Sequence, residues 1–167
     1  MRKGFSMIEL IFVIVILGLL ATVAVPRLTA TRDDAEIAKV TANIQTLLSD
    51  LTTYYTSQGK FSSDISQMTN VPLEIDGNNK KIADMTAAGK KCIKFTLVDF
   101  VTDAGDTKGK PAVIKVEKGA NQNDSLCLKI LGNKGIEKLL NNQFKYINAA
   151  GVEKESEAGE YPVSGLS

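Results

Sequence analysis

The sequence of 167 residues contains no histidine. Histidine is the commonest general base, the usual activator of a serine or cysteine nucleophile, and a frequent zinc ligand. Its absence argues against most hydrolytic enzymes and most zinc sites, so we expect a protein that is not an enzyme. Net charge is also nearly absent, because 20 Lys and Arg face 19 Asp and Glu. The chain as a whole therefore has no field that would recruit nucleic acid or an anionic membrane surface.

Cysteine is scarce, and the two residues present are Cys92 and Cys127. Their separation does not fit the CxxC spacing of metal sites or thioredoxin-like sites. One disulfide between them is the simplest assignment. Such a bond would place this part of the chain in an oxidising compartment.

Charge is almost missing from the start of the chain. From Phe5 to Val25 only three residues are polar, and one of these, Glu9, is ionisable. A helix of about 20 apolar residues spans the hydrocarbon core of a membrane, so 5–25 is predicted to be a membrane span. Arg2 and Lys3 precede it, and the positive-inside rule keeps that end in the cytoplasm.

A cleaved secretory signal is the alternative for this region, with a cut after Ala24 or Ala30. The apolar part of such a signal is shorter and uncharged, whereas this one contains Glu9 and continues into a second helical pattern. In that pattern apolar residues recur in steps of three and four from Ile37 to Tyr55. We therefore predict one helix from Phe5 to about Ser57 that ends near Gly59.

The segment Gly4-Phe5-Ser6-Met7-Ile8-Glu9 follows a short basic leader and opens an apolar helix. It resembles the type IV prepilin signature, which is found in type IV pilins, in pseudopilins of type II secretion systems and in competence pilins. The resemblance covers roughly the first 55 residues. It implies a leader at 1–4, a membrane half of the helix at 5–25, an amphipathic half at 26–58 and a head at 59–167.

The resemblance also implies roles for single residues. A prepilin peptidase would cut after Gly4 and methylate the freed amine of Phe5, and Glu9 would face the Phe5 amine of a neighbouring subunit during assembly. Physical chemistry supports a partner for Glu9, because an unpaired charge in an apolar filament core is strongly unfavourable. The alternative is a carboxylate that reaches the interface of an ordinary membrane anchor. Gly18 and Pro26 mark a weak stretch of the helix that we expect to lose hydrogen bonds in a filament.

For the head we predict an α+β, type IV pilin-like fold, in which the long helix packs on a small antiparallel β-sheet. Residues 61–91 are rich in Ser, Asn, Asp and Gly and are predicted to form a structured loop. Alternating apolar residues predict strands at 92–100, 112–118 and 125–131, and a short helix followed by a strand is predicted for 136–147.

Alternation also assigns the faces of these strands. Phe95, Ile114 and Leu128 should face the helix with their alternate neighbours, and both cysteines should lie on the outer, polar side of the sheet. A simple three-strand meander would hold Cys92 and Cys127 too far apart for a disulfide. The strand order must therefore differ, or Cys92 must lie at a strand end that curls over.

We predict no cofactor. Calcium is the alternative, since the oxygen-rich segments 103–109 and 121–125 could supply ligands, and the resemblance implies that major pseudopilins often hold calcium in their C-terminal loops. Neither segment fits the EF-hand pattern, and both are interpreted as turns. Nucleic acid is not an expected partner, because Lys80, Lys81 and the pair 90–91 have acids nearby and no aromatic residues between them.

These features together predict a structural subunit of a type IV pilus or of a type II secretion pseudopilus. Its partners would be copies of itself, the prepilin peptidase, an inner-membrane assembly platform and, indirectly, a cytoplasmic assembly ATPase. It would cross the inner membrane once, with a periplasmic C-terminal domain, before it enters the filament. The alternative is a minor competence-type pilin, or a membrane-tethered periplasmic binding module, that captures DNA or another ligand.

Overall fold

The computed structural model describes residues 6–102 and 107–163, and of residues 25–30 it describes the backbone alone. Contacts divide the chain into two compact units, Met1–Glu36 and Ile37–Ser167. Helix α1 (Met7–Gln58) begins in the first unit and ends in the second. It ends as predicted, because Gly59 adopts a φ of 70° and its amide donates to the Tyr55 carbonyl at 2.7 Å.

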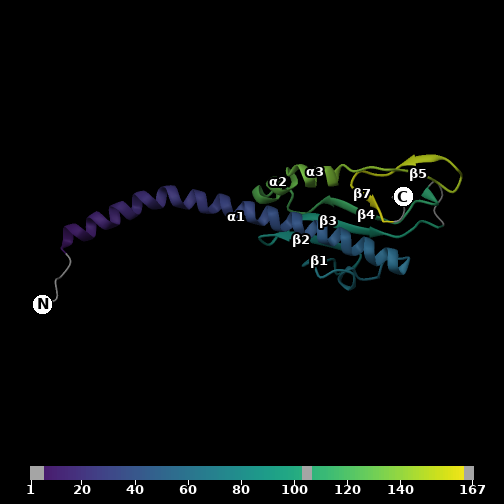
Figure 1. Cartoon of the computed structure of the whole chain (residues 1–167), viewed down its shortest axis with the longest axis horizontal. Helices are drawn as coiled ribbons and strands as arrows, with labels where there is room; N and C mark the ends of the chain where they lie inside the picture. Colours follow the sequence, from purple (N-terminus) through teal and green to yellow (C-terminus); the bar gives the residue numbers. More distant parts are fainter. Residues whose placement is uncertain (1–5, 103–106, 164–167) are drawn as a thin grey trace. The chain divides into compact units, whose positions relative to one another are not determined.

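The second unit is an α+β domain, as predicted. From here on, the name head includes the part of α1 from Ile37 as well as the predicted head at 59–167. Its antiparallel sheet has five strands in the order β1-β2-β3-β4-β7. Two short helices and a separate two-stranded hairpin, β5-β6, complete the head (Figure 1). The bounds are η1 Ile65–Gln67, β1 Glu74–Ile75, β2 Ile82–Ala87, β3 Lys90–Val98, β4 Val113–Lys118, α2 Ser125–Leu131, α3 Lys134–Leu140, β5 Lys145–Ile147, β6 Glu153–Glu155 and β7 Glu160–Pro162.

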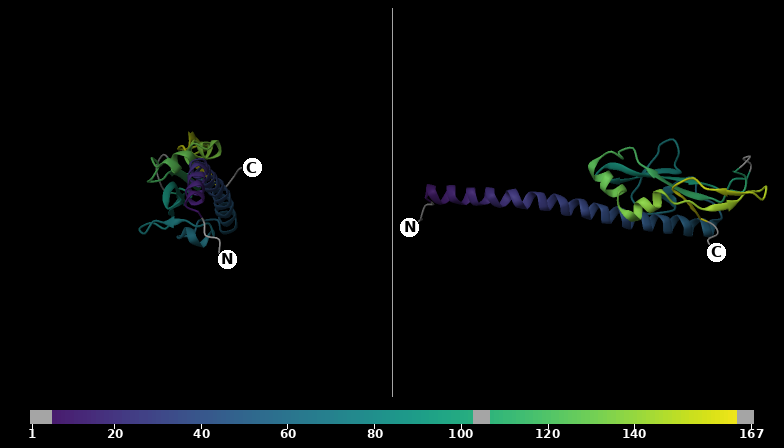
Figure 2. Two further views of the ribbon diagram at one scale, coloured as in Figure 1. Left: turned by 90° about the vertical axis from the view of Figure 1, so that its left-hand side faces the viewer. Right: turned by 90° about the horizontal axis from the view of Figure 1, so that it is seen from above.

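The core of the head lies between the sheet and the part of α1 that begins at Ile37, which run side by side in Figures 1 and 2. The predicted apolar stripe of α1 is confirmed, and the predicted inner faces of β3 and β4 are confirmed with it. Burial of one such apolar side chain contributes about 1.5–3 kcal/mol to the stability of the fold. The buried residues from these three elements include Val40, Ile44, Leu47, Leu51, Ile93, Phe95, Leu97, Ile114 and Val116.

The prediction of a loop at 61–91 was wrong from Glu74 onwards. Strands β1 and β2 lie there, and β2 pairs with β3. Ala88 and Gly89 join these strands with φ angles of 47° and 76°, the left-handed geometry of a two-residue hairpin turn. Every second residue of β2 is buried, including Met85. The alternating run before this turn was the sequence signal for β2, although Ala-Gly is not among the usual hairpin dipeptides.

The prediction of a strand at 125–131 was also wrong, since these residues form α2. Asp124 caps the helix, because its side chain accepts a hydrogen bond from the Leu126 amide at 3.0 Å. Leu126, Cys127 and Ile130 are buried on one helical face, whereas Leu128 is 56% exposed. Alternation had predicted that Leu128 faces the core, and this prediction was wrong. The predicted short helix and strand in 136–147 are confirmed as α3 and β5.

Gly159, next to the edge strand β7, approaches β4 closely. This close contact leads to a testable prediction. Gly159 has a φ of 81°, and a Cβ atom on it would lie 2.2 Å from the backbone oxygen of Val116. The two residues are also bonded, since the Val116 amide donates to the Gly159 carbonyl at 2.8 Å. Gly151 has a similar φ of 77°, but a Cβ atom there would meet nothing within 4 Å.

We expect Gly159→Ala to lower the free energy of unfolding by at least about 1 kcal/mol more than Gly151→Ala. Both substitutions strain the backbone, but only the first forces two strands apart. Urea unfolding followed by tyrosine fluorescence measures this difference, because all four tyrosines lie between positions 54 and 161. Equal losses in the two variants would show that the close approach of Gly159 to Val116 is unimportant.

Candidate membrane and assembly segment

The first part of α1 is apolar and has no cover within the chain. The stretch Met7–Ala24 is long and apolar enough to cross a membrane, and none of it is buried against described residues. Its large side chains are exposed, from Ile16 at 40% to Met7 at 83%. A soluble monomer rarely exposes so much contiguous apolar surface. This surface is therefore suited to lipid, to copies of the same helix, or to both in turn.

Glu9 forms a reciprocal capping box with Ser6 at the start of α1. The Ser6 amide donates to Oε2 of Glu9 at 2.8 Å, and the Glu9 amide donates to Oγ of Ser6 at 3.3 Å. Two amides that the first helical turn leaves without a backbone partner are satisfied in this way. The expectations from sequence missed the contribution of Ser6, although the spacing Ser-x-x-Glu indicates such a box.

The structure describes the other predicted residues of this segment only in part. Gly4 and Phe5 lie outside the described residues, so the predicted cut between them stays a prediction. At Gly18, a Cβ atom would meet nothing within 4 Å, so contacts within the described chain do not require glycine there. Pro26 lies within α1, but its side chain is outside the described part. The predicted loss of helical bonds between Gly18 and Pro26 concerns the filament and also stays a prediction.

Comparison with known proteins agrees with this arrangement. Residues 1–25 match the protein family described as the prokaryotic N-terminal methylation motif. The chain carries a prepilin-type N-terminus. The match includes Gly4, Phe5 and Glu9, and it supports the resemblance that the sequence suggested. Residues 1–25 are called the prepilin-type segment below.

Two similar proteins are both named type II secretion system core protein G. One, from Klebsiella michiganensis, is 37% identical over 60 residues, which are 36% of this chain and 42% of that protein. The other, from Pectobacterium carotovorum subsp. carotovorum, is 36% identical over 62 residues, or 37% of this chain and 40% of that protein. The chain thus spans less than half the length of these relatives. No solved structure matches the chain.

Outside the prepilin-type segment, the disulfide is present as predicted. Cys92 and Cys127 are bonded, and their Cα atoms lie 5.0 Å apart. The predicted place was wrong, since both cysteines are fully buried in the core of the head. A β-bulge explains the change of side: Ile93 pairs with Met85 and Lys91 with Thr86, so Cys92 is the extra residue. The distance conflict disappears because Cys127 is on a helix.

Three of the four lysines considered for nucleic-acid binding form ion pairs with carboxylates. Lys80 lies 3.0 Å from Asp64, Lys81 pairs with Asp99, and Lys91 lies 3.0 Å from Glu74. Hydrogen bonds to Glu74 and Asp84 raise the pKa of the Lys91 ammonium group above its ordinary value. These cations are already neutralised locally, as the sequence suggested, which weakens the case for a phosphate-binding surface.

In the segment 121–125, considered for calcium binding, side-chain oxygens accept hydrogen bonds from backbone amides. Oδ1 of Asn121 accepts a hydrogen bond from the Lys91 amide at 3.0 Å, and Asp124 caps α2. The other segment, 103–109, falls partly outside the described residues. Among residues 6–102 and 107–163, no group of three His, Cys, Asp or Glu side chains is placed to hold one metal ion.

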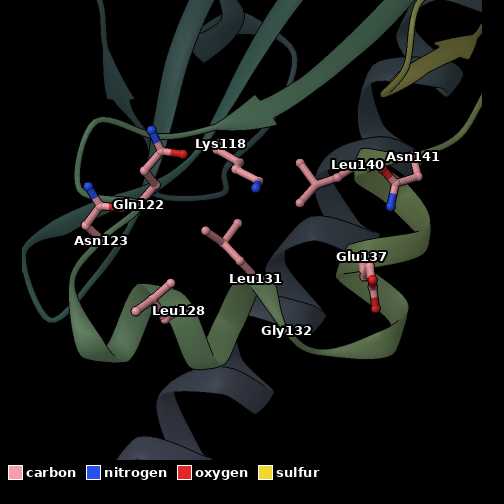
Figure 3. A pocket seen from close by; sticks show the side chains of 9 residues that line it. All are labelled: Lys118, Gln122, Asn123, Leu128, Leu131, Gly132, Glu137, Leu140 and Asn141. Atoms are coloured by element: carbon pink, nitrogen blue, oxygen red, sulfur yellow. The ribbon is translucent and has the colours of Figure 1, made fainter.

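A surface cavity of about 380 Å³ lies between the end of β4, α2 and α3 (Figure 3). Leu128, Leu131 and Leu140 form its apolar part. Its polar lining comes from several elements and mixes opposite charges with carboxamides: Lys118, Gln122, Asn123, Glu137 and Asn141. This mixture does not select one chemical class of ligand. The sequence did not indicate the cavity, because α2 had been predicted to be a strand.

Proposed function

We propose that this chain is a structural subunit of a type II secretion pseudopilus. The observation that carries the proposal is the exposed apolar helix Met7–Ala24, with a single carboxylate, Glu9, near its start. In the membrane this helix faces lipid, and in a filament it packs against the same helix of neighbouring copies. The names of the two similar proteins support the choice of a pseudopilus over a type IV pilus.

Before assembly, the subunit crosses the inner membrane once. Arg2 and Lys3 hold the N-terminus in the cytoplasm, and the head folds in the periplasm, where Cys92 and Cys127 are oxidised. A prepilin peptidase cuts after Gly4 and methylates the amine of Phe5. The subunit performs no chemistry itself. An inner-membrane platform and a cytoplasmic ATPase supply the assembly work.

Intact mass spectrometry of the membrane-extracted protein tests this proposal. We expect a chain that lacks Met1–Gly4, carries one added methyl group and contains one disulfide. Sheared material from the same cells should contain this processed form in excess over any single secreted substrate, because a filament contains many copies of its subunit. A chain that begins near Val25 or Thr31 would instead identify a secreted soluble domain and refute the proposal.

The competence-type or binding-module alternative predicts a different result. A tip protein would be far less abundant than the main subunit of the same filament, and it would retain DNA in a salt-dependent way. The local pairing of Lys80, Lys81 and Lys91 with carboxylates does not favour this alternative.

A further inference from the structure

The capping box at the start of α1 has a consequence for Glu9 beyond local helix stability. Ser6 contacts Glu9 twice, once through its amide and once through its hydroxyl oxygen, at 2.8 Å and 3.3 Å. Both residues are exposed, so side chains from the head do not enforce this arrangement. The carboxylate is therefore held over the first turn, at the end of α1 where the chain is expected to be cut.

The box occupies one of the two carboxylate oxygens. Oε2 of Glu9 accepts the bond from the Ser6 amide, which leaves acceptor capacity on the carboxylate. An ionised carboxylate can accept several hydrogen bonds, so Glu9 remains able to bind a cation while the box is intact. A glutamate side chain has several rotatable bonds, and Ser6 restricts them before any partner arrives.

We propose that Ser6 is a positioning residue, which holds the Glu9 carboxylate ready for the Phe5 amine of a neighbouring subunit. This inference rests on the proposed function. The pairing of Glu9 with that amine was already expected. The new element is that Ser6 restricts the carboxylate in the unassembled subunit, so less freedom is lost when the pair forms. Its amide binds Oε2 of Glu9, and its hydroxyl accepts the Glu9 amide and so holds the turn in which that bond forms. The box survives processing, because the Ser6 amide remains a peptide amide after a cut between Gly4 and Phe5.

Three single variants of the full chain and one double variant, produced with the assembly machinery, test the inference. Ser6→Ala removes the hydroxyl that accepts a hydrogen bond from the Glu9 amide, and Ser6→Thr keeps a hydroxyl at this position. The readout is the ratio of sheared filament to processed subunit in the membrane, so any change in processing is divided out. Loss of a cap of this kind corresponds to about a fivefold change in an equilibrium, so we expect a ratio about fivefold lower for Ser6→Ala. Ser6→Thr should stay within about twofold of wild type.

The third variant separates positioning from simple helix capping. Glutamine can occupy the same position of a capping box, so Glu9→Gln keeps the box but removes the charge. If Ser6 only caps the helix, Ser6→Ala should cost the same fivefold in the Glu9→Gln background. If Ser6 positions the charge, its loss should change the ratio by less than about twofold there, because no charge pair remains to be prepared.

Every outcome of these experiments either supports the positioning role of Ser6 or overturns it. Normal assembly of Ser6→Ala, poor assembly of Ser6→Thr, or equal losses in the two backgrounds would overturn the positioning role. Failure of the proposed function looks different, because then wild type would form no filament or Glu9→Ala would assemble as well as wild type. If Glu9→Ala fails and Ser6→Ala assembles normally, only the inference about Ser6 is wrong.

Discussion

Replacement of both Cys92 and Cys127 with alanine should lower the free energy of unfolding of the head by about 3.8 kcal/mol. The disulfide closes a loop of about 36 residues, and in the chain-entropy model such a loop restricts the unfolded chain by this amount. The bond joins the bulged strand β3 to α2, and both cysteines are fully buried. Urea unfolding of the detergent-solubilised protein, followed by tyrosine fluorescence, measures the change.

Reduction provides the matched control for this prediction. A thiol reductant should lower the stability of the wild-type head towards that of the double alanine variant, and it should not change the variant. Alkylation under denaturing conditions should label no thiol before reduction and two after it, because the chain contains only these two cysteines. Labelling of two thiols in unreduced protein would show that the cysteines are free in the mature protein and would remove the support for an oxidising compartment.

Periodicity carried most of the successful predictions of the fold. The apolar stripe of α1 repeats over about five turns, and the inner residues of β3 and β4 alternate without interruption, so both signals are long enough to be distinctive. Gly59 marked the end of α1 because a glycine in the left-handed region commonly follows a helix. These elements depend on local patterns, and tertiary contacts did not alter them.

The errors occurred where a short run fits two periods or where register decides the outcome. The apolar residues of 125–131 fit an alternating strand through Leu126, Leu128 and Ile130, but they also fit one face of a short helix. The cap from Asp124 favoured the helix. The side on which Cys92 lies depends on a bulge against β2, a strand that the sequence had not revealed, so counting residues within β3 alone gave the wrong face.

The candidate site was largely predictable for a different reason. The match to the methylation motif lies within residues 1–25, and its signal is the order of residues itself, without any need for tertiary contacts. Glu9 was conspicuous because it is the only charge in an apolar run. Ser6 was overlooked because a polar residue at the edge of such a run is common, and its value becomes visible only in the bonds that it makes with Glu9.

The largest effect on assembly is expected from Glu9→Ala. The variant should enter the membrane and be cut after Gly4 as wild type is, because loss of a charge makes the span more apolar and the orienting residues Arg2 and Lys3 are unchanged. Filament assembly should fall sharply. The amine of a neighbouring Phe5 would enter an apolar core without its partner, and breaking a buried ion pair in this way typically costs about 3–5 kcal/mol.

Two further variants assign this loss to the charge of Glu9. Glu9→Gln retains an acceptor for the Ser6 amide, so it keeps the cap, and it should assemble in part because a neutral hydrogen bond is weaker than a charge-assisted one. Glu137→Ala makes the same change of charge on the surface of the head and should assemble normally. Processed subunit and sheared filament are measured from the same cells for all three. Normal filaments from Glu9→Ala would mean that this carboxylate only reaches the membrane interface, and that another contact selects correctly registered neighbours.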